Sequence, residues 1–294
     1  MLFSPQRASG QDGGGSGAFL RLGLGTRALG LGGAYTAVAD DGAAVYWNPA
    51  GVARIQRHWA EMMYRRMGLD RRQFVLAYTQ GLEPGGGVGF AWVNVGVDGI
   101  DGRDLNGQPT GMLTDSENAV FFSFSPQFSR RISAGLSMKF LYNRLAGQTA
   151  KGFGGDIGVL VRPVEPLSLG LQFRDIGTRI TWNTAGLFDQ NVRRRETFPR
   201  SLTVGASYRA FQNRVLIATD VEKAQRRETA FRAGAEVGLP GGVIARTGLN
   251  DGQWAAGAGF ITAVKSTRIR FNYVFLMDRI GLHETHAFEW EFGF

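Results

Sequence analysis

The stretch Ile132–Asn143 reads ISAGLSMKFLYN, and its apolar side chains recur at every second position. Leu136 and Phe140 fall on one face of such a segment, whereas Ser137 and Lys139 fall on the other. Successive side chains of a β-strand point to opposite faces, so this period of two indicates a strand with one apolar and one polar face. At twelve residues, the segment exceeds the usual length of a soluble strand, which is about 5–6 residues.

The same alternation is the dominant signal from about residue 70 to the C-terminus. A tilted transmembrane strand needs about 9–11 residues, and most of the alternating segments are 9 to 13 residues long. Their length therefore favours a membrane barrel over a sandwich or a propeller. We delimit fourteen segments, at 59–67, 71–80, 86–98, 117–128, 131–145, 152–163, 166–175, 199–209, 213–223, 228–238, 242–250, 254–262, 267–276 and 285–294.

The connections between these segments differ on the two sides of the predicted sheet. Every second connection is short, as at 210–212 and 239–241, and the others include longer stretches at 99–116, 176–198 and 277–284. Outer-membrane barrels have an even number of strands, short periplasmic turns and longer outer loops. We therefore predict an all-β fold, a 14-stranded antiparallel transmembrane β-barrel in the outer membrane of a Gram-negative-type bacterium.

The polar faces of these segments carry charges of both signs. Arg or Lys facing lipid at the bilayer midplane costs about 2–4 kcal/mol, so the charged faces are predicted to line the lumen. A soluble barrel would instead place them outside, around an apolar core, but fourteen strands enclose more volume than side chains fill easily. The lumen charges that we single out are Arg174, Arg232, Glu236, Arg246, Arg268, Arg270 and Glu289.

The composition excludes several classes of protein. The 294 residues include 33 Lys and Arg, 25 Asp and Glu, three His and no Cys, which gives a net charge of +8. Without cysteine there is no disulfide framework, thiolate metal site or thiol nucleophile. We expect no metal, no cofactor and no enzymatic activity. The sequence contains no basic run with interleaved aromatics, so it gives no indication of nucleic-acid binding. It also contains no run of about 18 apolar residues, which a transmembrane helix would need.

Two segments precede the first predicted strand. Residues 1–17 lack the apolar core of a secretory signal, and their composition predicts a flexible segment. Residues 18–56 are rich in glycine and show no sustained alternation. We predict that they fold into the lumen as a hatch, because a 14-stranded barrel would otherwise be an open pore. Residues 57–294 would then form the barrel.

The stretch Gly25–Gly51, GTRALGLGGAYTAVADDGAAVYWNPAG, resembles the N-terminal signature of the PorV/PorQ family, a branch of the FadL-like outer-membrane barrels. GLNDG at Gly248–Gly252 and the terminal GLHETHAFEWEFGF are similar to the same family. The resemblance implies a 14-stranded barrel with an N-terminal hatch. It also implies a part in a type IX-like secretion or surface-attachment pathway, with secretion-system components or cargo C-terminal signals as partners. FadL-like members instead pass hydrophobic small molecules across the outer membrane, and this function is the alternative.

The hatch motif is the part of this resemblance that we expect to matter most. Asn48 and Pro49 suit a tight turn, because Pro fixes φ and Asn caps through its side chain. Tyr46 and Trp47 are expected to pack inside the lumen, and both acidic residues of the motif are expected to pair with lumen arginines. The motif either anchors the hatch or contacts a ligand. It comprises Asp40, Asp41, Tyr46, Trp47, Asn48, Pro49, Ala50 and Gly51.

The C-terminus carries a second motif. Trp290, Phe292 and Phe294 alternate up to the last residue, and they resemble the signal that the barrel-assembly machinery recognises. We therefore expect that machinery and outer-membrane lipid as partners, and a hydrophobic small molecule under the alternative function. Trp182 falls in the expected outer loop 176–198, where it would help to shape the entrance for a ligand.

Overall fold

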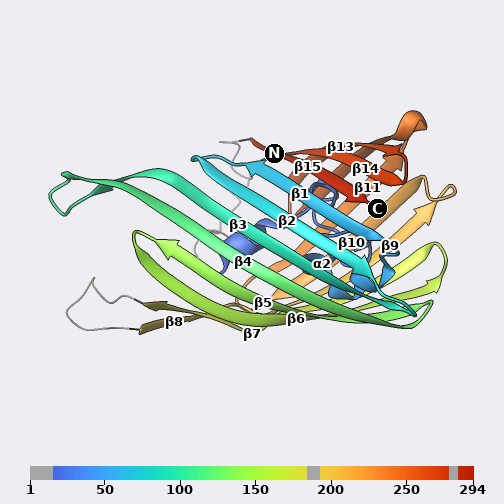
Figure 1. Cartoon of the computed structure of the whole chain (residues 1–294), viewed down its shortest axis with the longest axis horizontal. Coiled ribbons are helices and arrows are strands. Elements are labelled where there is room, and N and C mark those ends of the chain that lie inside the picture. Colours follow the sequence, from blue (N-terminus) through green and yellow to red (C-terminus); the bar gives the residue numbers. More distant parts are fainter. Residues whose placement is uncertain (1–15, 184–192, 278–283) are drawn as a thin grey trace, which may run out of the picture.

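The wall of the molecule is one closed antiparallel sheet that surrounds the N-terminal segment (Figure 1). The computed structural model describes residues 16–183, 193–277 and 284–294, so most of the predicted segment 1–17 lies outside the described residues. The strands are β1 (His58–Arg66), β2 (Arg71–Gly81), β3 (Gly86–Arg103), β4 (Pro109–Ser129), β5 (Ile132–Leu145), β6 (Gln148–Val164), β7 (Leu167–Asn183), β8 (Arg193–Thr197), β9 (Ser201–Ala210), β10 (Val215–Ala224), β11 (Thr229–Gly238), β12 (Val243–Asn250), β13 (Gln253–Val264), β14 (Thr267–Leu276) and β15 (Thr285–Gly293).

The sheet closes where the first and last strands pair, with Trp59 opposite Gly293. Strand β7 pairs with β9 along its first half and with β8 from Arg179 to Asn183. Strands β8 and β9 therefore lie end to end beside β7 and count as one position in the wall. The wall has fourteen positions, although fifteen strands are described. The predicted 14-stranded antiparallel barrel is confirmed.

The exposure of the side chains is that of a membrane barrel. In β5, Leu136 and Phe140 are 48% and 52% exposed, whereas Ser137 and Lys139 on the other face are almost fully buried. Apolar residues thus face outward and polar residues inward, as expected for a wall in contact with lipid. The soluble-barrel alternative predicts the opposite arrangement and is wrong.

Several strands run further than the sequence predicts. Strands β3 and β4 pair up to Arg103 and Pro109, so most of the expected loop 99–116 is a hairpin that projects beyond its neighbours (Figure 1). Likewise Trp182 lies in β7, paired with Ala150 and Arg194, and not in a loop. The apolar alternation stops where the wall leaves the lipid, but backbone pairing needs no apolar face and continues.

The two ends of the barrel differ as expected. At the end where β1 begins and β15 stops, tight connections join β2 to β3, β4 to β5 and β9 to β10. The long hairpins β3–β4 and β7–β8 project from the opposite end. The short-turn end is the periplasmic side in a barrel of this kind. Among the described residues, no helix has the length and apolar character needed to cross a bilayer.

The N-terminal segment occupies the lumen. It forms four short helices, η1 (Ala18–Leu22), α1 (Thr26–Gly30), α2 (Ala44–Trp47) and η2 (Pro49–Arg54), before β1 begins at His58. Inward-facing glycines of more than one wall strand contact it. A Cβ atom at Gly158 of β6 would clash with Asn48, and one at Gly234 of β11 would clash with Leu31. The wall therefore carries glycine where the segment approaches its backbone most closely. We refer to residues 18–56 as the hatch.

Candidate functional site

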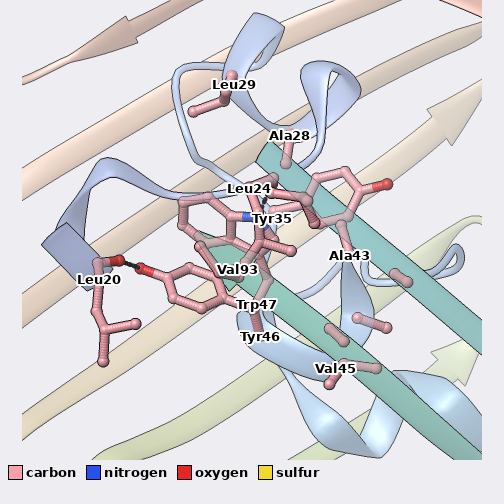
Figure 2. Packing of buried hydrophobic residues seen from close by; sticks show 14 of the residues in the cluster. Leu20, Leu24, Ala28, Leu29, Tyr35, Ala43, Val45, Tyr46, Trp47 and Val93 are labelled. Carbon is pink, nitrogen blue, oxygen red and sulfur yellow. Dashed lines mark hydrogen bonds between the residues drawn. The ribbon is translucent and has the colours of Figure 1, made fainter. Parts of the chain in front are cut away.

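The hatch is built around an aromatic pair. The rings of Tyr46 and Trp47 lie side by side in Figure 2, with centroids 5.0 Å apart and an interplanar angle of 87°. The Tyr46 hydroxyl donates to the carbonyl oxygen of Leu20 at 2.5 Å, and the Trp47 indole donates to that of Leu24 at 2.7 Å. Edge-to-face packing together with satisfied polar atoms fixes the orientation of both rings. Both side chains are almost fully buried.

Asn48 connects the hatch to the wall. Its side-chain oxygen accepts from the Ala50 amide at 3.1 Å, which caps η2 at Pro49. Its Nδ2 donates to the carbonyl of Thr36 in the hatch at 2.8 Å and to that of Val159 in β6 at 3.2 Å. The side chain is fully buried. Removing it would therefore leave these carbonyl groups without a hydrogen-bond donor.

Arg27 in α1 is the charged centre of the hatch. Its guanidinium makes a two-pronged contact with Glu236 of β11, at 2.7 and 2.9 Å. It also donates to Asp40 at 2.6 Å and to the Tyr35 hydroxyl at 3.0 Å, and it lies 3.3 Å from Asp41. One buried cation thus holds together three carboxylates from the hatch and the wall.

The two acidic residues of the motif have different surroundings. Asp40 pairs with Arg209 of β9 at 2.6 Å, as expected for a lumen arginine, and also with Arg27. Asp41 contacts Arg27 and the Tyr35 hydroxyl, which both belong to the hatch, so the expected wall arginine is absent for Asp41 among the described residues. Burial raises the pKa of Asp41 to about 6. Burial also opposes ionisation of Asp40, but the charges of Arg27 and Arg209 lower its pKa.

Most of the predicted lumen charges lie around the hatch. Glu289 accepts from the amide and hydroxyl of Thr26, and Arg246 binds Glu236 at 2.6 Å. Arg270 pairs with Glu291 at 2.7 Å. Arg268 differs from the rest, because it is exposed at the short-turn end and makes no ion pair with a described residue.

Arg174 and Arg232 pack against the rings of the aromatic pair. The Arg174 guanidinium lies 4.2 Å from the centroid of the Tyr46 ring and donates to the Tyr46 hydroxyl at 3.0 Å. Both arginines lie within 6 Å of the Trp47 ring, at 5.8 and 5.9 Å. Arg232 pairs with Glu222 at 2.6 Å. Cation–π contacts of this kind contribute about 0.5–2 kcal/mol each.

A cavity of about 540 Å³ lies above the aromatic pair. Tyr46 and Trp47 line it, and so do Met67, Asp251 and Thr285 at the ends of the outer strands, so the cavity opens toward the long-hairpin side. Its lining mixes apolar and charged groups. Besides those five, the lining includes the apolar residues Leu22, Leu29, Ala230, Ala255 and Leu276 and the charged residues Arg21, Arg65, Arg71, Arg174, Arg227, Arg232, Glu222 and Glu228.

The C-terminal motif lies on the outer wall. Trp290 packs edge-on against Phe271 of β14, with centroids 5.3 Å apart. Phe292 and Phe294 are 37% and 52% exposed, on the lipid-facing side. The ring of Phe294 stacks on His58, where the sheet closes. This placement leaves the assembly-signal function as a prediction.

Sequence reasoning missed several site residues. Arg27 and Tyr35 lie inside the stretch that we singled out, yet neither belongs to an alternating segment that would assign it a face. Arg65 in β1 donates to the carbonyl of Leu22 at 2.8 Å, and it lines the cavity. Its inward position could have been read from the alternation of β1, in which Glu61 and Met63 are also buried.

Neither a family model nor a curated protein matches the sequence. Solved structures match the fold. The Pseudomonas putida toluene transporter TodX and the Ralstonia pickettii toluene transporter TbuX each align with a TM-score of 0.63 at 14% identity, over 92% of this chain and 98% of theirs. A Pseudomonas aeruginosa FadL homologue aligns with a TM-score of 0.62 at 11% identity over the same shares. The chain has the FadL-type barrel fold.

This finding confirms the FadL-like part of the expected resemblance at the level of the fold. Barrels of this type lie in the outer membrane of Gram-negative bacteria, which is the predicted location. The finer assignment to the PorV/PorQ branch rests on the sequence motifs alone. Two of the three neighbours are named as transporters of toluene, an apolar aromatic molecule.

Proposed function

We propose that this protein is an outer-membrane channel that takes up hydrophobic small molecules. The outward-opening cavity of about 540 Å³ above Tyr46 and Trp47 carries the proposal. Ligand pockets have volumes of about 300–1,000 Å³, and the lining of this cavity offers apolar residues such as Leu22 and Leu29 as well as charged ones. An apolar ligand that enters gains about 25 cal/mol for each Å² of its surface removed from water. Aromatic ligands gain further from edge-to-face contact with the two rings.

Passage through the barrel requires the hatch to move. Below the aromatic pair the hatch residues Val45, Ala50 and Val52 are fully buried against the wall. The polar contacts of Arg27, Asn48 and Thr26 with the wall are among those that a shift must break. We therefore assign these residues to holding the closed state, and the aromatic pair to contact with the ligand.

Replacing Trp47 should slow the uptake of toluene. The Trp47→Ala variant removes one ring from the cavity floor and exposes Leu24, so cells that carry it should take up radiolabelled toluene at least fivefold more slowly than wild type. Trp47→Phe keeps an aromatic ring and should retain at least half the rate. Trp254→Leu is the matched control, because Trp254 is 57% exposed on the outer wall. Equal rates for Trp47→Ala and the control would refute the proposal.

The secretion function is a second candidate, and it rests on the resemblance of Gly25–Gly51. Among the described connections on the outer side, those between β1 and β2 and between β12 and β13 are tight turns. The hairpins β3–β4 and β7–β8 project further and are the described surface on which a cargo signal would dock (Figure 1). Unchanged display of secreted cargo after deletion of 99–107 would argue against this role.

A further inference from the structure

The short-turn end of the barrel concentrates positive charge. Among the described residues, Glu83 and Glu165 are the acidic residues on its turns, and Asp40 lies just inside. Nine cationic side chains lie at this end, and the net charge of the whole chain is +8. They are Arg54, Arg57, Arg130, Arg131, Arg162, Arg209, Arg214, Lys265 and Arg268.

These cations form two tiers. The rim tier lies on exposed turns and comprises Arg57, Arg130, Arg131, Arg214 and Lys265. The mouth tier comprises Arg54 of η2 together with Arg162, Arg209 and Arg268, which occupy inward positions near the ends of three strands. Arg162 follows the fully buried Leu160 by two residues in β6, and Arg209 follows the buried Ser207 by two in β9. Arg268 occupies the corresponding position in β14, two before Arg270.

Little within the described residues balances this charge. Arg209 pairs with Asp40, but the other eight cations make no ion pair with a described residue. Arg54 contacts the Ser168 hydroxyl at 3.3 Å, which carries no charge. Burial and then the neighbouring charge of Arg162 lower the pKa of Arg54 to about 10. The mouth is therefore a place where an incoming anionic group relieves repulsion between like charges.

We propose that this basic face, formed by the rim and mouth tiers together, is the docking surface for an acidic periplasmic protein that covers the mouth of the barrel. The mouth tier faces the lumen, so headgroups of the surrounding lipid reach the rim tier alone. A single small anion contacts a few of the cations, whereas the charge extends over strands on opposite sides of the mouth, such as β6 and β14. A protein surface can meet both tiers at once, and complementary charge would speed and orient its arrival. The inference goes beyond uptake and does not depend on which molecule crosses the barrel.

The test uses the intact chain in nanodiscs of zwitterionic lipid, with a fluorescein-labelled deca-glutamate peptide as the probe. The peptide should bind, and its Kd should rise at least tenfold between 50 and 300 mM salt. The mouth variant Arg162→Gln/Arg268→Gln should weaken binding at least fivefold. The matched control Arg144→Gln/Lys151→Gln removes the same charge from exposed positions at the outer end and should change the Kd by less than twofold. Retention of heat-dependent gel mobility shows that each variant is folded.

The same variants are then compared in cells with a photo-cross-linking residue at Gln212, on the exposed β9–β10 turn. A protein adduct should form, should be acidic in sequence, and should be lost in the mouth variant but kept in the control. Equal loss of peptide binding in both double variants would show bulk attraction and overturn the proposal. Adducts to lipid alone would also overturn the proposal. The same holds if the mouth variant behaves like wild type while Arg130→Gln/Arg131→Gln loses co-purifying anionic lipid.

Discussion

Deleting residues 18–56 should turn the barrel into an open pore. The hatch fills the lumen and leaves hatch residues such as Val45 and Ala50 with no exposed surface. A barrel of this size without a plug encloses an aqueous channel. Single-channel conductance in planar bilayers should therefore rise at least tenfold over that of the intact protein. Unchanged conductance of the folded variant would mean that the hatch does not close the lumen.

A point substitution tests the same prediction without removing a segment. Gly158→Leu places a side chain where Asn48 now meets β6, so the hatch must shift away from that wall. We expect frequent openings to a conducting state, at least tenfold more often than in wild type. Gly85→Leu is the control, because a Cβ atom there would lie 3.6 Å from its nearest neighbour on an exposed turn. Equal opening frequencies in the two variants would contradict the packing described for the hatch.

Removing the charge of Arg27 should destabilise the closed barrel strongly. In Arg27→Gln the carboxylates of Asp41 and Glu236 lose their shared cation, and breaking a buried ion pair costs about 3–5 kcal/mol. Urea titration in lipid vesicles should show a loss of this size in the free energy of unfolding. The hatch should also become accessible to added protease before the wall does.

Two comparisons separate this effect from a general loss of charge. Arg103→Gln breaks an exposed pair with Asp101 and should cost about 0–1 kcal/mol. Arg27→Gln/Asp41→Asn removes the cation together with the carboxylate whose ion-pair partner among the described residues is Arg27 alone, and should be less destabilised than Arg27→Gln. If Arg27→Gln and Arg103→Gln were equally stable, Arg27 would not be the charged centre of the hatch.

The barrel could be predicted from the sequence because its lipid face imposes a strict pattern. Every apolar residue of β5 from Ile132 to Tyr142 that the alternation places outward is at least partly exposed. The pattern failed where the constraint ends. The pairing of β3 with β4 beyond Val97 mixes apolar, polar and glycine residues and is interrupted by two register shifts, so no periodicity marks it.

The sequence predicts a lumen position for the hatch but not its path. Its helices are four to six residues long, and contacts that span much of the chain determine their path. Arg27 meets Glu236 across 209 positions, and Asn48 meets Val159 across 111. Short helices with such distant partners carry no local period that would reveal those contacts. The expected wall arginine beside Asp41 was wrong for this reason, since Arg27 of the hatch itself occupies that place.

The most direct test of the proposed uptake is a crystal structure of the intact protein soaked with 4-bromotoluene. Anomalous scattering locates the bromine independently of the rest of the map. The proposal predicts a bromine peak inside the cavity, in contact with the ring of Trp47 and absent in crystals of Trp47→Ala. Bromine found on the lipid-facing wall alone, with the cavity holding only water, would contradict it.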